Sequence, residues 1–177
     1  MPVITLYPTA VKAGSGSPLF TDAQLTNILG NNDNAVGYTE PQSNYPTVYG
    51  GFYFDTSQIP SGAVIDSIAG GVRANCTYWA EKSYYGVSLY HPVHGTIVTH
   101  LKKDLTYMWA DIVTTITPYT WPVDAIRDPG VVVYYWFLSN TDQPDSFAWR
   151  KAWITVDYTP GVPPTGGKNV LYLGENF

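Results

Sequence analysis

Short apolar runs separated by turn-forming residues constrain this chain more than any other feature of its sequence. The runs are roughly five to ten residues long and are punctuated by Gly, Pro, Asn and Asp, a pattern typical of β-sandwiches and barrels. Long stretches with helical periodicity are scarce. The sequence therefore predicts an all-β, antiparallel sandwich with little helix, and it places strands at residues 3–7, 48–55, 65–77, 85–90, 96–101, 111–117, 131–139, 148–158 and 169–173.

One turn and the strand after it can be predicted in detail. Pro60 presets the backbone angle of a turn, and Gly62 tolerates a left-handed conformation, so both residues have a structural role. In the strand that follows, Ile65 and Ile68 are separated by an odd interval, whereas the later apolar residues keep a period of two. A β-bulge at residues 66–67 would reconcile the two spacings.

The strand at residues 148–158 carries two tryptophans. Ile154 and Val156 face one way, and Trp149, Lys151 and Trp153 share the opposite parity, which predicts that both tryptophans stand on the exterior. Two interpretations remain open. Another segment of the chain packs over the rings as a second layer, or the rings form a subunit interface or a sugar-stacking platform.

Other segments are less regular. Residues 131–138 form an apolar run without polar alternation, which predicts a strand that is covered on both faces or meets a partner on one. Residues 122–127 predict one helical turn that begins at Pro122. Residues 21–29 predict either a short helix or an irregular crossing.

The 177 residues are predicted to form one sandwich domain at 1–160, followed by a Pro/Gly spacer at 161–167 and a strand-like arm at 168–177. Two adjacent prolines prevent the spacer from pairing as a central strand. The arm either folds back on its own sandwich or adds to the sheet edge of a neighbour. We expect Val170 and Tyr172 to be buried against a neighbouring subunit or protein.

Charge and composition exclude several partners. Net charge is −5 and the nine Lys and Arg are scattered, so no basic stripe predicts nucleic-acid binding. The first residues lack the pattern of a signal peptide, and no apolar run is long enough to span a membrane. The lone Cys76 excludes an internal disulfide and fits synthesis in a reducing cytoplasm.

The candidate sites for chemistry are weak. A metal site would require His91, His94 and His100 to converge, and their spacing crosses a predicted hairpin turn. Residues 31–34 with Glu40 offer oxygen ligands but lack the dense alternating carboxylates of a calcium loop. No Gly-x-Ser-x-Gly elbow is present. We therefore predict no catalytic residue, no metal, no cofactor and no enzymatic activity.

Phe52 and Phe54, the segment 59–65 (Ile-Pro-Ser-Gly-Ala-Val-Ile), Ile68 and Val72 form a recognisable series. It resembles the F-x-F … I-P-x-G-A-x-I-x-x-I-x-x-x-V pattern of a loose group of tailed-bacteriophage virion proteins of the minor tail, head and decoration type. The similarity extends over about residues 34–158, although the tryptophan that usually precedes Asn34 in that group is missing. The resemblance implies a jelly-roll-like sandwich in a virion, and it does not imply an enzyme.

Two functions follow as hypotheses. The first is a structural protein of the virion, made in the host cytoplasm, that contacts other virion proteins and copies of itself. This hypothesis agrees with a charged fraction of 13%, against about 25% in ordinary soluble domains, and an aromatic fraction of 15%. The second is a carbohydrate- or receptor-binding module that touches a cell-surface glycan. An aromatic row on an open sheet face favours the second function, and aromatic residues buried between subunits favour the first.

Overall fold

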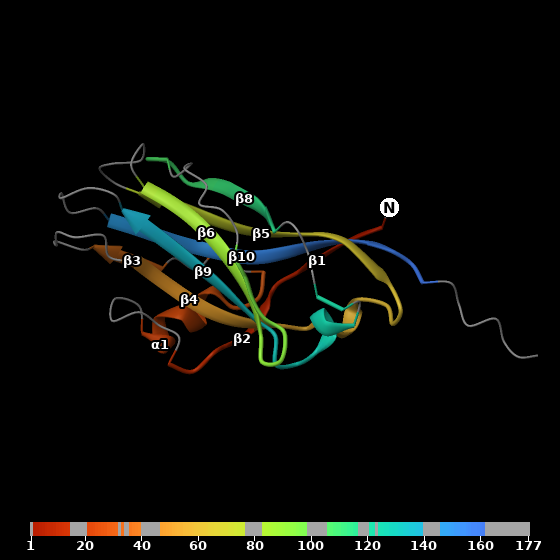
Figure 1. Ribbon diagram of the computed structural model, residues 1–177. Coiled ribbons are helices and arrows are strands. Elements are labelled where there is room, and N and C mark those ends of the chain that lie inside the picture. The colour runs from red at the N-terminus through yellow and green to blue at the C-terminus, as the bar shows by residue number, and fades with distance from the viewer. Residues whose placement is uncertain are drawn as a thin grey trace, which may run out of the picture.

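Strand pairing divides the chain into two antiparallel sheets. The computed structural model describes residues 2–14, 21–31, 33, 36–39, 47–76, 83–98, 106–116, 121–122, 124–139 and 146–161. In sheet A the order is β1 (Val3–Leu6), β10 (Ser146–Thr159), β5 (Val64–Cys76) and β8 (Ala110–Ile116), and β3 (Val36–Thr39) also pairs with β10. In sheet B the order is β2 (Pro8–Val11), β4 (Thr47–Phe54), β9 (Val132–Ser139), β6 (Ser83–His91) and β7 (Gly95–Val98). The protein is thus a jelly-roll-like antiparallel β-sandwich, as predicted (Figure 1).

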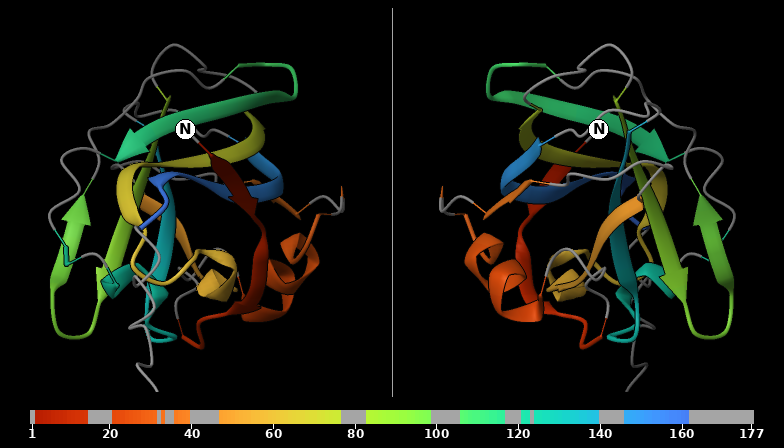
Figure 2. Two further views of the ribbon diagram at one scale, coloured as in Figure 1. Left: turned by 90° about the vertical axis from the view of Figure 1, so that its right-hand side faces the viewer. Right: turned by 90° about the vertical axis from the view of Figure 1, so that its left-hand side faces the viewer.

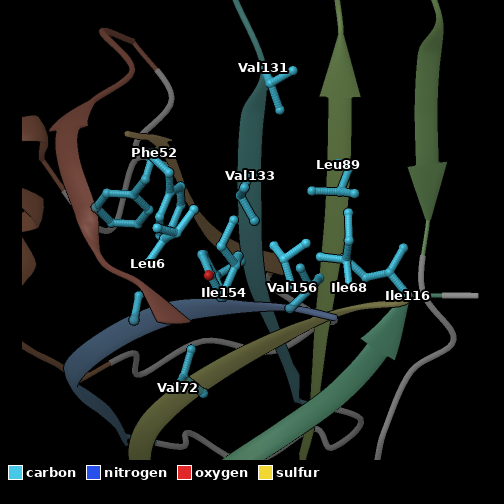
Figure 3. Packing of buried hydrophobic residues seen from close by; sticks show 14 of the residues in the cluster. Leu6, Phe52, Ile68, Val72, Leu89, Ile116, Val131, Val133, Ile154 and Val156 are labelled. Atoms are coloured by element: carbon cyan, nitrogen blue, oxygen red, sulfur yellow. The ribbon is translucent and has the colours of Figure 1, made fainter. Parts of the chain in front are cut away.

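The core lies between the two sheets because alternate residues of each strand are apolar and point inward. Figure 3 shows Ile68, Ile154 and Val156 of sheet A facing Val133 and Leu89 of sheet B. All five side chains are almost fully buried. Complete burial of an aliphatic side chain of this size is worth about 1.5–3 kcal/mol. This packing holds the two sheets together, and Figure 2 shows the ribbon of the sandwich from two further sides.

The irregularities predicted around residue 65 are present. Gly62 has a φ of +72°, and the Ala63 N–H donates to the Pro60 carbonyl at 3.2 Å, which confirms the turn. On β5, Ser67 pairs with Asp157 and Ile65 pairs with Tyr158, so residue 66 is an extra residue. The predicted β-bulge is therefore confirmed.

The N-terminal segment differs from its prediction. One strand was expected at residues 3–7, but the chain changes sheets at Tyr7, so that β1 pairs with β10 and β2 pairs with β4. Pro8 is tolerated as the first residue of β2, where its missing N–H costs least. The short strand β3 was not predicted either.

Several connections between the strands contain short helices or 3₁₀ turns. α1 (Asp22–Leu25) begins with a capping box, in which the Thr21 side chain accepts from the Gln24 N–H and the Gln24 side chain accepts from the Thr21 N–H. It continues into the 3₁₀ turn η1 (Thr26–Ile28), and Leu25 lies over Gly50 of β4. The 3₁₀ turns η2 (Thr56–Gln58) and η4 (Ala125–Arg127) contact each other at the end of the sandwich away from α1 (Figure 1). The helical turn predicted at residues 122–127 is present as η4, but it begins at Ala125 and not at Pro122.

One hydrophobic cluster extends from Leu6 to Val156. Gly161, where the predicted spacer begins, lies against the Gly62 carbonyl. The rest of the spacer and the arm, with Val170 and Tyr172, lie outside the described residues, so these domain boundaries stay a prediction. In the described part of the chain, every helix is too short or too polar to cross a membrane.

Candidate functional site

The outer face of sheet A is formed by the residues whose side chains point away from the core, and these alternate with the core residues along each strand. Trp153 of β10 pairs with Gly71 of β5, and Gly71 pairs in turn with Val113 of β8. A Cβ atom on Gly71 would lie 2.1 Å from the Trp153 ring, so the indole lies directly over the glycine. The residue is only partly buried, so part of it remains open to solvent. The predicted position of Trp153 is confirmed.

A shallow depression of about 140 Å³ lies beside this ring. Its lining combines Thr5, Tyr7, Asp111, Lys151 and Trp153, and we call it the Trp153 depression. These residues come from β1, β8 and β10 and from the segment after β1, which are brought together by strand pairing. The Lys151 Nζ lies 5.3 Å from the centroid of the Tyr7 ring, a cation–π distance. The predicted outward position of Lys151 is also confirmed.

An ion-pair network borders the depression. Arg73 Nε donates to Asp111 Oδ1 at 2.7 Å, and Arg73 Nη2 donates to Asp111 Oδ2 at 3.1 Å, a bidentate pair. Arg73 Nη1 also lies 3.7 Å from Asp33 Oδ2. The hydrogen bond to Asp111, together with the negative charge of that carboxylate, raises the pKa of Arg73 above its ordinary value. The network fixes the Asp111 carboxylate at the edge of the depression.

Trp149 does not belong to this face, and the prediction that it stands on the exterior is wrong. It pairs with Ala74, whereas Lys151 pairs with Arg73, so Arg150 is an extra residue that forms a second β-bulge. The bulge reverses the parity of the strand and turns Trp149 into the core, where it is 0% exposed. Its Nε1 donates to the Lys151 carbonyl at 2.9 Å across the bulge.

The outer face of sheet B has a different character. None of its five strands contains an Asp, Glu, Lys or Arg residue, whereas β5, β8 and β10 of sheet A all do. Five of its outward side chains are half-buried, and we call them the aromatic face: Tyr53, Ser88, Tyr90, Tyr134 and Trp136. The Tyr90 and Tyr134 rings make an edge contact at 6.5 Å. Trp136 lies over Gly86, where a Cβ would approach the ring to 2.2 Å.

The apolar run at residues 131–138 is therefore a central strand with two kinds of face. Val133, Tyr135 and Phe137 point into the core, and Tyr134 and Trp136 point outward. The missing polar alternation, which predicted either a covered strand or a partner, was the sequence signal for the aromatic face.

His91 and His94 lie at another part of the sandwich. A hollow of about 580 Å³ is lined by the β6–β7 turn, η2 and η4, and it contains His91 and His94. His91 is 3% exposed, and its Nδ1 accepts the Val93 and His94 N–H groups at 3.0 and 3.2 Å. Its Nε2 lies 3.4 Å from Asp128 Oδ2. Both ring nitrogens thus have protein partners, so this ring ties the turn to η4.

Among the described residues, no group of three or more His, Cys, Asp or Glu side chains is arranged to hold a metal. His100, Glu40 and part of the segment 31–34 lie outside those residues. Pro60 and Gly62 build the turn after η2 and take no part in either outer face.

Comparison with known proteins adds distant similarities only. No family model matches the sequence, and no curated protein matches it. A truncated AlyQ with CBM32 and alginate lyase domains has a TM-score of 0.47 at 11% identity, over 93% of this chain and 36% of that chain. The xylan-binding module CBM15 has a TM-score of 0.46 at 12% identity, over 91% of this chain and 99% of that one. Infectious bursal disease virus, Gt strain, has a TM-score of 0.35 at 10% identity, over 88% and 32%. At these values the similarities assign no function to this chain.

Proposed function

We propose that this chain is a non-enzymatic structural protein of a tailed-bacteriophage virion, in capsid decoration, the head or the tail, and that it works through protein–protein contacts. The observation that carries the proposal is the aromatic face. Its tyrosines and tryptophan are half-buried on β4, β6 and β9, in a five-stranded sheet whose strands contain no Asp, Glu, Lys or Arg. Interfaces between proteins are enriched in Tyr and Trp at their centres and depleted of charge.

The residues that resemble the virion-protein pattern have a structural role in the sandwich. Phe52, Ile59, Ala63, Ile68 and Val72 are all buried in the core. Phe54 and Ile65 lie at its margin, each 9% exposed. The resemblance is therefore carried by residues that build the sandwich. The contact chemistry has to come from the outer faces, and sheet B presents the larger uncharged one.

A charge placed in the centre of the aromatic face should weaken association. Ser88 pairs with Tyr134 and is half-buried, so Ser88→Glu puts a carboxylate among the rings. Burying an unpaired carboxylate at an interface is costly, so we expect association with itself or with particles to weaken at least about tenfold. Sedimentation velocity at micromolar concentration and binding to purified particles measure this effect.

The matched control for that experiment is Thr115→Glu, because Thr115 is exposed on the outer face of sheet A. It should leave association unchanged. A wild-type protein that is a monomer at every concentration and does not bind particles would overturn the proposal, as would an equal loss in both variants.

The C-terminal arm provides a second test of the contact role. The arm follows Gly161, the last described residue, which lies against the Gly62 carbonyl. The residues of the hydrophobic core all precede Gly161 in the sequence. We expect deletion of the residues after Pro164 to leave the unfolding midpoint within a few degrees of the full chain and to weaken assembly. Thermal melting and sedimentation of the truncated chain check this. A truncated chain that does not fold would show that the arm is an ordinary strand of its own core.

A further inference from the structure

The Trp153 depression differs chemically from the aromatic face on the opposite side of the sandwich. Here two aromatic rings, Trp153 and Tyr7, lie among charged and hydroxyl-bearing side chains, and the proposed protein-contact role of sheet B does not involve these residues. The Trp153 indole spans Gly71, where a Cβ would come within 2.1 Å of the ring. The absence of that Cβ leaves room for the ring directly over the strand backbone, and Trp153 is only partly buried there.

Polar groups surround the ring on several sides. Asp111 accepts two hydrogen bonds from Arg73, and each of its oxygens keeps a further lone pair for an incoming hydroxyl. Lys151 has three N–H donors, and among the described residues its recorded contact is with the Tyr7 ring and not with a carboxylate. The Thr5 hydroxyl both donates and accepts. A ligand that carries many hydroxyl groups can use all of these at once.

The charges at the site balance. Lys151 and Arg73 are cationic, and Asp111 and Asp33, both ion-paired to Arg73, are anionic. A site with no net charge gives little advantage to an anion such as a nucleotide, whose phosphates would also meet Asp111. The volume, about 140 Å³, is far below the roughly 300–1,000 Å³ of pockets for drug-sized molecules. This favours one flat, neutral ring lying on the surface.

From this geometry we propose that the Trp153 depression binds a neutral carbohydrate, with one pyranose ring stacked on the outer face of Trp153. The apolar C–H face of the sugar lies on the indole, which combines a large apolar surface with an electron-rich face. The sugar hydroxyls bind the Asp111 carboxylate, the Lys151 ammonium and the Thr5 hydroxyl. The protein thereby gains a contact with a glycan on one face while the other face holds the assembly.

The competing explanation is structural, because an aromatic side chain over a strand glycine also shields the exposed backbone. Trp136 over Gly86 provides the internal comparison, since it has the same arrangement on sheet B without the surrounding charges. A shielding role predicts similar behaviour for the two tryptophans. A sugar site predicts that only Trp153 matters for binding.

The experiment titrates the full chain with oligosaccharides of glucose, galactose, mannose and xylose, and with oligogalacturonate as the anionic arm, by calorimetry up to millimolar concentration. We expect at least one neutral oligosaccharide to bind. Trp153→Ala should weaken that binding at least about tenfold, and Lys151→Met, which keeps the apolar stem, should weaken it severalfold. Trp136→Ala is the matched control and should bind normally.

Failure to bind any neutral member of the panel overturns the proposal, as does tighter binding of oligogalacturonate or a greater loss in Trp136→Ala than in Trp153→Ala. If Trp153→Ala does not fold, the Lys151→Met result and the shift of the Trp153 indole N–H resonance on titration decide the question. Particle association of Lys151→Met reports on the aromatic face separately, so the two proposals can fail independently.

Discussion

Replacement of Trp149 by alanine is expected to lower the free energy of unfolding by about 4 kcal/mol, because the largest side chain at the centre of the core is removed. The Trp149 ring lies 5.4 Å from Phe52, 5.7 Å from Tyr135 and 5.4 Å from Phe137, measured between ring centroids. The variant leaves a cavity between the sheets and also loses the indole hydrogen bond across the Arg150 bulge. Urea denaturation of both proteins measures the difference.

Trp153→Ala is the control for that measurement, because Trp153 is on the same strand but only partly buried. We expect it to cost about 1 kcal/mol. A larger loss for Trp153→Ala than for Trp149→Ala would contradict the position of the bulge and the assignment of the two tryptophans to opposite faces.

The free energy of unfolding should fall steeply at alkaline pH. Burial raises the pKa of the Tyr85 and Tyr135 phenols well above the ordinary value, and the neighbouring Tyr135 adds to the effect on Tyr85. In the unfolded chain both ionise at about pH 10. Between the unfolded and folded pKa values the folded state therefore holds more protons, so the stability is complete below pH 10 and falls as the pH rises.

Within this pH window the loss should be about 1.4 kcal/mol per pH unit for each phenol. Domains are usually stable by only about 5–15 kcal/mol, so the ionisation of two buried phenols removes a substantial part of the stability. Circular dichroism against pH should show one cooperative loss of structure. The phenolate absorbance of Tyr85 and Tyr135, obtained as the difference between the wild type and the Tyr85→Phe/Tyr135→Phe double variant, should rise in the same step. Ionisation of these two phenols in a protein that stays folded would contradict their buried positions.

Two phenylalanine variants separate the contributions of Tyr85 and Tyr135 to the loss of stability at alkaline pH. Tyr85→Phe and Tyr135→Phe should each remove half of the alkaline slope. At neutral pH, Tyr135→Phe should cost about 1 kcal/mol, because the Tyr135 hydroxyl donates to the Trp153 carbonyl at 2.7 Å. Tyr85→Phe should cost nothing or stabilise, since among the described residues its buried hydroxyl has no hydrogen-bond partner.

The sandwich could be predicted from the sequence because its signals are local. Pro60 and Gly62 act within one turn, and the odd interval between Ile65 and Ile68 reveals the bulge at residue 66. The bulge at Arg150 was not predicted. Extending the alternation of residues 152–158 back along the strand gives Trp149 the parity of Lys151 and Trp153, and the extra residue at Arg150 reverses that parity.

The candidate sites were only partly predictable, for a different reason. Lys151 and Trp153 lie on one strand, and their shared parity indicated a common face. Tyr7 and Asp111 join them from distant parts of the chain through strand order and register, which depend on the packing of the whole core. The aromatic face is similar, since Tyr53, Tyr90 and Tyr134 meet only after β4, β9 and β6 have paired.

Electron cryo-microscopy of the intact particles whose genome encodes this chain tests the central claim most directly. We predict density for the sandwich in every particle, with Tyr53, Ser88, Tyr134 and Trp136 of sheet B covered by a neighbouring subunit or another virion protein and with Trp153 turned to solvent. Particles that lack this density, or that contain it with the aromatic face exposed to solvent, would contradict the claim.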